Sequence, residues 1–76
     1  MAVTTLDYDY SKLKGKIIEV FGTQRDFAKA IGISQQTISY KLNGLAEWTQ
    51  EDIEKTISAL GIPASEIHIY FFYQKS

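Results

Sequence analysis

Residues 23–44 constrain the fold of this chain more than any other segment. Their apolar side chains recur at three- and four-residue spacing in two short runs, which is the pattern of two amphipathic helices. Gly32 separates the runs at the point where a sharp corner requires a positive φ, and the hydroxyl residues Thr23 and Ser34 stand where N-caps are expected. This order predicts a helix-turn-helix over residues 24–43.

Two further helices are predicted, one on each side of this motif. Apolar residues at helical spacing and a stop at Gly22 indicate a helix from Ser11, its expected N-cap, to Phe21. A second such pattern lies between Thr49, another expected N-cap, and Gly61. Acidic residues in the first turns of this helix suit the positive end of its dipole.

The C-terminal residues allow two interpretations. Apolar positions after Pro63 at first alternate, so helix and strand compete there. We favour a short helix to about Ile69 that runs into an extended tail. Residues 1–10 are expected to form a flexible N-terminal arm, and residues 11–76 a single domain. The expected fold class is therefore all-α, a compact five-helix domain with an extended C-terminal tail.

Composition excludes several classes of function. A chain of 76 residues forms one small domain. It has no cysteine and a single histidine, His68, so a thiolate or histidine metal site cannot form, and we expect no cofactor or small-molecule ligand. No set of nucleophile, base and pocket can be assembled from the sequence, so we expect no enzyme. The sequence shows neither a signal-peptide pattern nor an apolar run of about 18 residues, so we expect a cytoplasmic protein without a membrane segment.

The net charge of −1 hides an asymmetry along the chain. Residues 1–46 hold six bases and four acids, a charge of +2, whereas residues 47–76 hold two bases and five acids, a charge of −3. A positive half that carries the helix-turn-helix suits one-sided docking on phosphate. Ordinary scatter of surface charge explains the same asymmetry, and the small number of cations implies weak non-specific affinity for DNA.

The second helix of the motif presents residues that can read bases. Gln35 and Gln36 lie in its first turn, and a glutamine side chain offers a donor and an acceptor that match N6 and N7 of adenine. Ser39 can reach a base edge or a phosphate, and Thr37 can offer its methyl group to thymine or pack at the corner. These four residues are the base-reading candidates. The structural alternative is a solvated helical face on which two glutamines happen to be adjacent.

Phosphate contacts are expected around both helices of the motif. Helix N-termini bind anions through unpaired backbone amides, which indicates the first residues of the two helices. Side chains near the end of the second helix lie where that helix would leave the groove, within reach of backbone oxygens. The phosphate-contacting candidates are Gln24, Ser34, Tyr40, Lys41 and Asn43.

Residues 11–62 resemble the helix-turn-helix family of lambdoid phage Cro proteins and repressors, also called XRE-like. The resemblance rests on Gln24-Arg-Asp-Phe-Ala-Lys-Ala-Ile-Gly-Ile-Ser-Gln-Gln-Thr-Ile-Ser and on Asn43-Gly44 at the close of the second helix. It implies a five-helix domain that binds double-stranded operator DNA as a symmetric homodimer, in a phage or prophage repressor that acts by operator occupancy. Two residues depart from the family pattern: Lys41 stands where an apolar residue is common, and Glu47 in the following loop would repel phosphate.

Aromatic residues are concentrated near the C-terminus. One interpretation is that Phe71 or Phe72 closes the core from below. The other is a dimer surface, because a Cro-like protein must pair to span two half-sites about 34 Å apart. The candidates for this surface are Trp48, Tyr70, Phe72 and Tyr73.

Two functions fit these features. The first is a sequence-specific DNA-binding transcriptional repressor, which Gln24, Gln35 and Gln36 favour. The second is a protein-interaction module on the same fold that modulates a partner repressor, which the acidic second half, Glu47 and the aromatic C-terminal segment favour. Salt dependence separates them, because phosphate-driven binding weakens steeply as the salt concentration rises.

Overall fold

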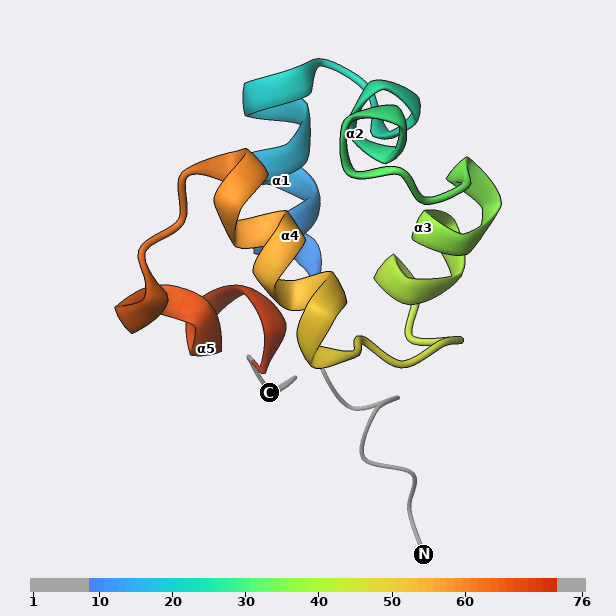
Figure 1. The fold of residues 1–76 in the computed structure, drawn as a ribbon. Helices are drawn as coiled ribbons and strands as arrows, with labels where there is room; N and C mark the ends of the chain where they lie inside the picture. Colours follow the sequence, from blue (N-terminus) through green and yellow to red (C-terminus); the bar gives the residue numbers. More distant parts are fainter. Residues whose placement is uncertain (1–8, 73–76) are drawn as a thin grey trace, which may run out of the picture.

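The computed structural model describes residues 9–72, and the structural statements below concern these residues. They form five α-helices and one short 3₁₀ helix, and no strand (Figure 1). In chain order the elements are α1 (Ser11–Phe21), α2 (Gln24–Ile31), α3 (Gln35–Leu42), α4 (Gln50–Leu60), η2 (Ala64–Glu66) and α5 (Ile67–Phe71). The predicted all-α, five-helix fold is confirmed, and α2 and α3 form the predicted pair of helices joined by a corner. None of the helices in the described part is long and apolar enough to cross a membrane.

Three of the four predicted N-caps are present. The side-chain oxygens of Thr23, Ser34 and Thr49 accept hydrogen bonds from backbone N–H groups in the first turns of α2, α3 and α4. The prediction for Ser11 is wrong, because Ser11 is already the first residue of α1, and its amide and hydroxyl donate to Oδ1 of Asp9 at 2.8 and 2.5 Å. A carboxylate is the stronger acceptor, so the serine acts as the donor at this end.

The folded domain begins before the boundary that we predicted after residue 10. Tyr10 is only 6% exposed and belongs to the core, and its ring centroid lies 6.2 Å from that of Trp48. Tyr10 precedes the first helical turn, so helical periodicity could not assign its side chain to a face. Residues 1–8 of the predicted arm lie outside the described residues.

The core is a single apolar cluster enclosed by the helices. α1 packs against α2, α4 and α5, and α2 packs also against α3 and α4. The buried members of the cluster are Tyr10, Leu13, Ile17, Phe27, Ala28, Ile31, Ile38, Leu42, Leu60, Ile62 and Phe71. Because α3 lies at the edge of the bundle (Figure 1), its outer face is left open to solvent.

The C-terminal segment is helical for longer than we predicted. α5 extends to Phe71, two residues beyond Ile69, so the strand alternative is wrong for this stretch. Phe71 is 1% exposed and meets the Trp48 ring edge-on, with the centroids 5.0 Å apart, so it is the residue that closes the core. Phe72 lies in a bend and is 47% exposed. The rest of the predicted extended tail, residues 73–76, lies outside the described residues.

Gly32 and Gly15 provide a matched pair of substitutions. Gly32 ends α2 with φ 76°, a left-handed conformation that costs alanine about 1–2 kcal/mol. Gly15 is exposed within α1 and has no atom within 4 Å of an added Cβ, and alanine stabilises such a position by about 0.5–1 kcal/mol. We expect Gly32→Ala to lower the free energy of unfolding and Gly15→Ala to raise it by these amounts. Urea unfolding followed by circular dichroism measures both, and a Gly32→Ala variant as stable as the parent would contradict the left-handed corner.

Candidate functional site

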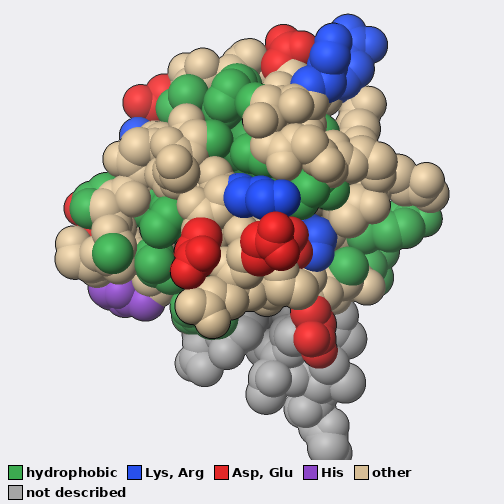
Figure 2. Space-filling model, in the orientation of Figure 1, with side chains coloured by type: hydrophobic (Ala, Val, Ile, Leu, Met, Phe, Trp, Pro, Cys, Tyr) green, Lys and Arg blue, Asp and Glu red, His purple; other side chains and the backbone are tan. Residues whose placement is uncertain are grey.

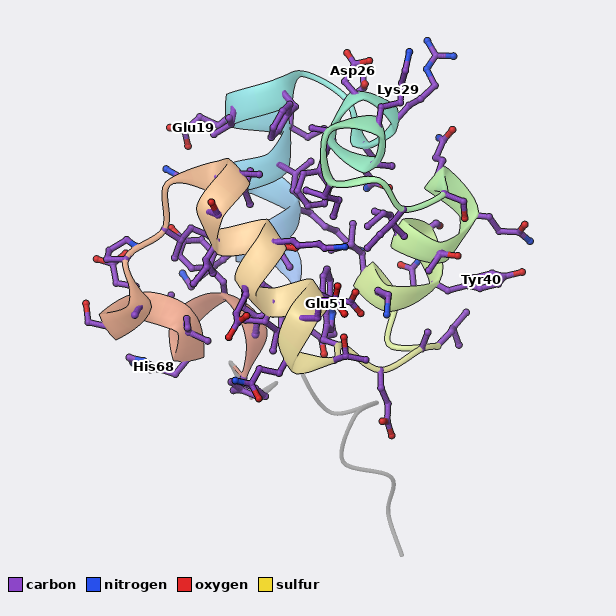
Figure 3. The ribbon with its side chains drawn as sticks, viewed as in Figure 1. Glu19, Asp26, Lys29, Tyr40, Glu51 and His68 are labelled. Atoms are coloured by element: carbon purple, nitrogen blue, oxygen red, sulfur yellow. The ribbon has the colours of Figure 1, made fainter. Side chains whose placement is uncertain are left out.

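The outer face of α3 is accessible where base-reading residues were predicted. Gln35 and Gln36 are both exposed in its first turn. Nε2 of Gln36 donates to the hydroxyl of Tyr40 at 2.8 Å, one helical turn further on. Tyr40 points away from the body of the molecule (Figure 3). The structure therefore brings the two glutamines to an open surface and ties the second one to a tyrosine.

The hydroxyl groups of Ser34 and Thr37, at the start of α3, are hydrogen-bonded to each other. Oγ of Ser34 accepts the backbone amide of Thr37 at 3.2 Å and donates to Oγ1 of Thr37 at 2.8 Å. Thr37 is half-buried at the corner, which agrees with the second of its two predicted roles, packing between the helices. A contact of either residue with a base or a phosphate would compete with the cap of the helix.

The end of α3 is also hydrogen-bonded within the protein. Nδ2 of Asn43 donates to the backbone oxygen of Ser39 at 2.9 Å and to its Oγ at 3.4 Å. Oδ1 of Asn43 accepts from Nζ of Lys14 on α1 at 3.2 Å. Gln24 is half-buried as the first residue of α2. A DNA contact of the Asn43 side chain would compete with these internal hydrogen bonds.

Lys41, predicted to contact phosphate, points into the protein instead. Its side chain is 9% exposed, and Nζ donates to the backbone oxygen of Glu47 at 2.6 Å and to Oδ2 of Asp52 at 2.7 Å. The ammonium group also lies 5.7 Å from the centroid of the Trp48 ring. The prediction is wrong because position 41 lies on the inward side of α3, next to buried Leu42, where a carboxylate and a carbonyl accept the charge.

Asp52 is the partner of Lys41 that the sequence reasoning missed. Two signals could have found it. Thr49 and Asp52 have the spacing of a capping box, which the structure shows to be formed. Such a box fixes the carboxylate near the start of α4. The second signal is Lys41 itself, because a lysine at a commonly apolar position needs a buried acceptor.

The surroundings of Asp52 lower its pKa. Burial alone raises the pKa of this carboxyl, but hydrogen bonds from Lys41 and Thr49 and the positive charge of Lys41 together lower it by more. The net pKa is below the ordinary value of 3.8. Asp52 is therefore ionised at neutral pH, as its hydrogen bonds to Lys41 and to the start of α4 require.

Protonation of Asp52 is expected to destabilise the fold. Because its pKa is lower in the folded chain than in the unfolded one, the carboxylate contributes stability that is complete above pH 3.8 and is lost as the pH falls through the folded pKa. Urea unfolding at a series of pH values measures this loss. We expect the free energy of unfolding to fall more in the wild type than in Asp52→Asn as the pH drops below 3.8. Equal pH dependence in the two proteins would contradict the assignment.

The predicted dimer surface is not a single exposed patch. Trp48 is half-buried and packs between Tyr10 and Phe71, so its assignment to a dimer surface is wrong, since its ring completes the core. Tyr70 is half-buried and Phe72 is exposed. The fourth candidate, Tyr73, lies outside the described residues.

An exposed apolar pair lies at the C-terminal end of α3. Tyr40 is 45% exposed and Leu45, in the loop that follows, is 68% exposed. The backbone amide of Leu45 donates to the backbone oxygen of Tyr40 at 2.8 Å, which holds the two residues together. With Gln36, bonded to the hydroxyl of Tyr40, they form a surface that we call the α3 patch. The sequence analysis did not predict a functional role for Leu45. The only signal for one was its place as a large apolar residue in a loop.

Several acidic side chains lie close to this loop. Figure 2 shows acidic side chains of α4 and the preceding loop on the same face as the apolar side chains at the end of α3. The exposed acids of this segment are Glu47, Glu51 and Glu54. α3 contributes one base, Lys41, which is buried, and Lys29 on α2 points outward away from Tyr40 (Figure 3). A phosphate backbone along this side of α3 would meet the charge of Glu47. Two cations also lie near: Lys55 pairs with Glu51 at 3.4 Å, and Lys14 lies beside Asn43 at the end of α3.

The chain matches one protein family and is similar to a solved structure. Residues 6–74 match a family model described as "Protein of unknown function (DUF739)". No curated protein matches the chain. Among solved structures it is similar to the solution structure of the modulator of repression (MOR) of the temperate bacteriophage TP901-1 from Lactococcus lactis, with 44% sequence identity and a TM-score of 0.77. That alignment covers 90% of this chain and 92% of the phage protein.

Proposed function

We propose that this chain, which belongs to the family described as "Protein of unknown function (DUF739)", binds a phage repressor and modulates its action through protein–protein contact. The phage protein with which it shares its fold and 44% of its aligned residues is a modulator of repression. That similarity supports the second of the two functions considered above. Membership of the Cro/repressor family stays a prediction from the resemblance.

The 44% identity with the phage modulator of repression, over 90% of this chain, is the observation that carries this proposal, and the side chains at the end of α3 agree with it. A DNA reader places cations where its recognition helix passes the phosphates. Here the single base of α3 is 7% exposed and is bonded to Asp52 and to Glu47. What the same end of α3 exposes is the α3 patch, whose aromatic and aliphatic side chains are of the kind that dominate the centres of protein interfaces. We therefore assign the repressor contact to this patch.

Direct operator binding is the second candidate, and one observation favours it. Gln35 and Gln36 are exposed in the first turn of α3, the end that reads bases in helix-turn-helix proteins. A symmetric dimer on DNA would be needed to reach two half-sites, and Tyr70 and Phe72 are the described candidates for its contact. Neither function requires catalysis, and both place the chain in the cytoplasm of a bacterial host.

A direct comparison of two ligands tests the proposal. The purified chain is titrated with the repressor encoded by the same phage or prophage, and separately used to select from a random duplex DNA library near physiological salt. We expect a complex with the repressor and no enrichment of an inverted repeat. Enrichment of a repeat without a repressor complex would overturn the proposal in favour of DNA reading.

A double substitution checks the DNA alternative. Gln35→Ala with Gln36→Ala removes both glutamines from an exposed surface, so the fold is expected to survive. If α3 reads bases, each lost pair costs about 1–3 kcal/mol, and any operator preference found for the parent should disappear. If our proposal holds, parent and variant have equally weak, salt-sensitive affinity for all duplexes. Fluorescence anisotropy with labelled duplexes measures the difference.

A further inference from the structure

We infer that Lys41 and Asp52 form a clamp that holds the α3–α4 loop in the shape that presents the α3 patch, so that Lys41 is a positioning residue for repressor binding. This inference rests on the proposed function. The clamp joins three segments through one ammonium group. Lys41 belongs to α3, its first acceptor is the backbone oxygen of Glu47 in the loop at 2.6 Å, and its second is Oδ2 of Asp52 on α4 at 2.7 Å.

The clamp also includes the first turn of α4. The carboxylate oxygen that accepts from Lys41 accepts the backbone amide of Thr49 at 3.2 Å as well. The side chains of Lys41 and Asp52 are 9% and 16% exposed, so water competes little for these bonds. Movement of the loop away from α3 would take from the buried ammonium group its hydrogen bond to the oxygen of Glu47, which is unfavourable because a buried charge needs its hydrogen-bond partners.

The loop held in this way carries the most exposed large apolar side chain of the described residues. Leu45 is fixed to α3 by the bond from its amide to the oxygen of Tyr40 at 2.8 Å, and the preceding residue, Gly44, donates its amide to the oxygen of Lys41 at 3.2 Å. Gly44 has φ 77°, which turns the chain back over the end of α3. Lys41 therefore holds the loop at two points. Its backbone oxygen binds the amide of Gly44, next to Leu45, and its ammonium group binds the oxygen of Glu47.

A loop fixed before binding does not have to be ordered by the partner. Ordering a loop and its side chains on association lowers affinity, and preorganisation removes that cost. The ammonium group of Lys41 thus serves to shape an apolar surface. This explains why a lysine stands at a position that is commonly apolar, since an apolar side chain could bind neither the loop carbonyl nor Asp52.

The test removes the clamp without leaving an unpaired charge. Lys41→Met with Asp52→Asn replaces the ion pair by uncharged side chains of similar size, and asparagine still offers an acceptor to the amide of Thr49. The matched control, Lys16→Met with Glu19→Gln, removes the ion pair at 3.8 Å on α1. Amide hydrogen exchange at Leu45, compared with amides of α1, reports the loop, and titration with the repressor reports binding.

We expect Leu45 to exchange at least about tenfold faster in the clamp variant while the amides of α1 keep their rates, because only the loop is released. The repressor dissociation constant should rise at least about tenfold, and the control should match the wild type in both measurements. Faster exchange at Leu45 with unchanged affinity would overturn the positioning role. Unchanged exchange at Leu45 would overturn the clamp itself.

Failure of the proposed function is distinguishable from failure of the clamp. If the wild-type chain binds no repressor, the proposed function and the positioning role fail together, and exchange at Leu45 still decides whether the clamp exists. If the clamp variant does not fold, NMR of the wild type decides: the ammonium protons of Lys41 should exchange at least about 100-fold more slowly than those of exposed Lys55. Equal exchange of the two ammonium groups would overturn the clamp.

Discussion

Replacing Tyr40 and Leu45 together by alanine is expected to weaken binding to the partner repressor by at least about 100-fold. A tyrosine at the centre of an interface can cost about 2 kcal/mol or more when truncated, and full burial of a leucine side chain contributes about 1.5–3 kcal/mol. About 1.4 kcal/mol corresponds to a factor of ten in affinity. Both side chains are largely exposed, so their removal should change the stability of the free chain little. Isothermal titration calorimetry with the repressor measures the loss, and urea unfolding confirms the fold.

The chain offers a matched control for this variant. Ile18 and Val20 on α1 are 49% and 44% exposed, so Ile18→Ala with Val20→Ala removes a similar amount of exposed apolar surface away from α3. We expect this control to bind the repressor as the wild type does. A control that loses as much affinity as the Tyr40 and Leu45 variant would show that the contact does not lie at the α3 patch.

Phe71→Ala is expected to have the largest effect on stability. Phe71 is 1% exposed and packs edge-on against Trp48, and truncating a buried phenylalanine costs about 3–5 kcal/mol. A domain of this size has a free energy of unfolding of only about 5 kcal/mol. The variant should therefore be partly or wholly unfolded at 25 °C, which circular dichroism and the fluorescence of Trp48, the single tryptophan of the chain, both report.

The neighbouring phenylalanine is the control. Phe72 is 47% exposed, so Phe72→Ala should lower the free energy of unfolding by about 1 kcal/mol or less. The two variants differ only in which of two adjacent aromatic residues is truncated. Equal losses of stability would contradict the assignment of Phe71 as the residue that closes the core.

Local signals in the sequence predicted α2, α3 and the corner between them well. N-caps, helical spacing and a glycine corner act within a few residues, so their outcome depends little on the rest of the chain. Thr23, Ser34 and Thr49 cap helices as predicted, and Gly32 has the positive φ that the corner requires. The exposure of Gln35 follows from the same periodicity.

The errors concern side chains whose placement depends on residues far along the sequence. Lys41 was assigned to phosphate because it stands near the end of α3, whereas Asp52, eleven residues on, accepts its charge inside the protein. Trp48 and Phe71 meet across 23 positions, which no local pattern reveals. The short apolar run of α5 fits helix or strand equally, and its packing against α1 decides between them.

These errors share a consequence for function. The surface around α3 was predicted from residue types alone, and it then resembled a DNA reader with a cation at the end of the helix. Once Lys41 is placed inside, the exposed large apolar side chains at the end of α3 are Tyr40 and Leu45, and Asn43 and Glu47 are exposed beside them. The helices form as the resemblance to DNA-binding proteins implies, while the apolar side chains at the end of α3 suit the protein partner that we propose.

The most direct test of the central claim follows a repressor on its own operator. Labelled operator DNA is bound to the repressor of the same phage or prophage, the chain is added in increasing amounts, and anisotropy reports the affinity of the repressor for DNA. We expect the chain to change that affinity at least about tenfold, with no binding of its own to the operator. An unchanged repressor affinity, together with direct binding of the chain to the operator, would contradict the account and establish the chain as a DNA reader.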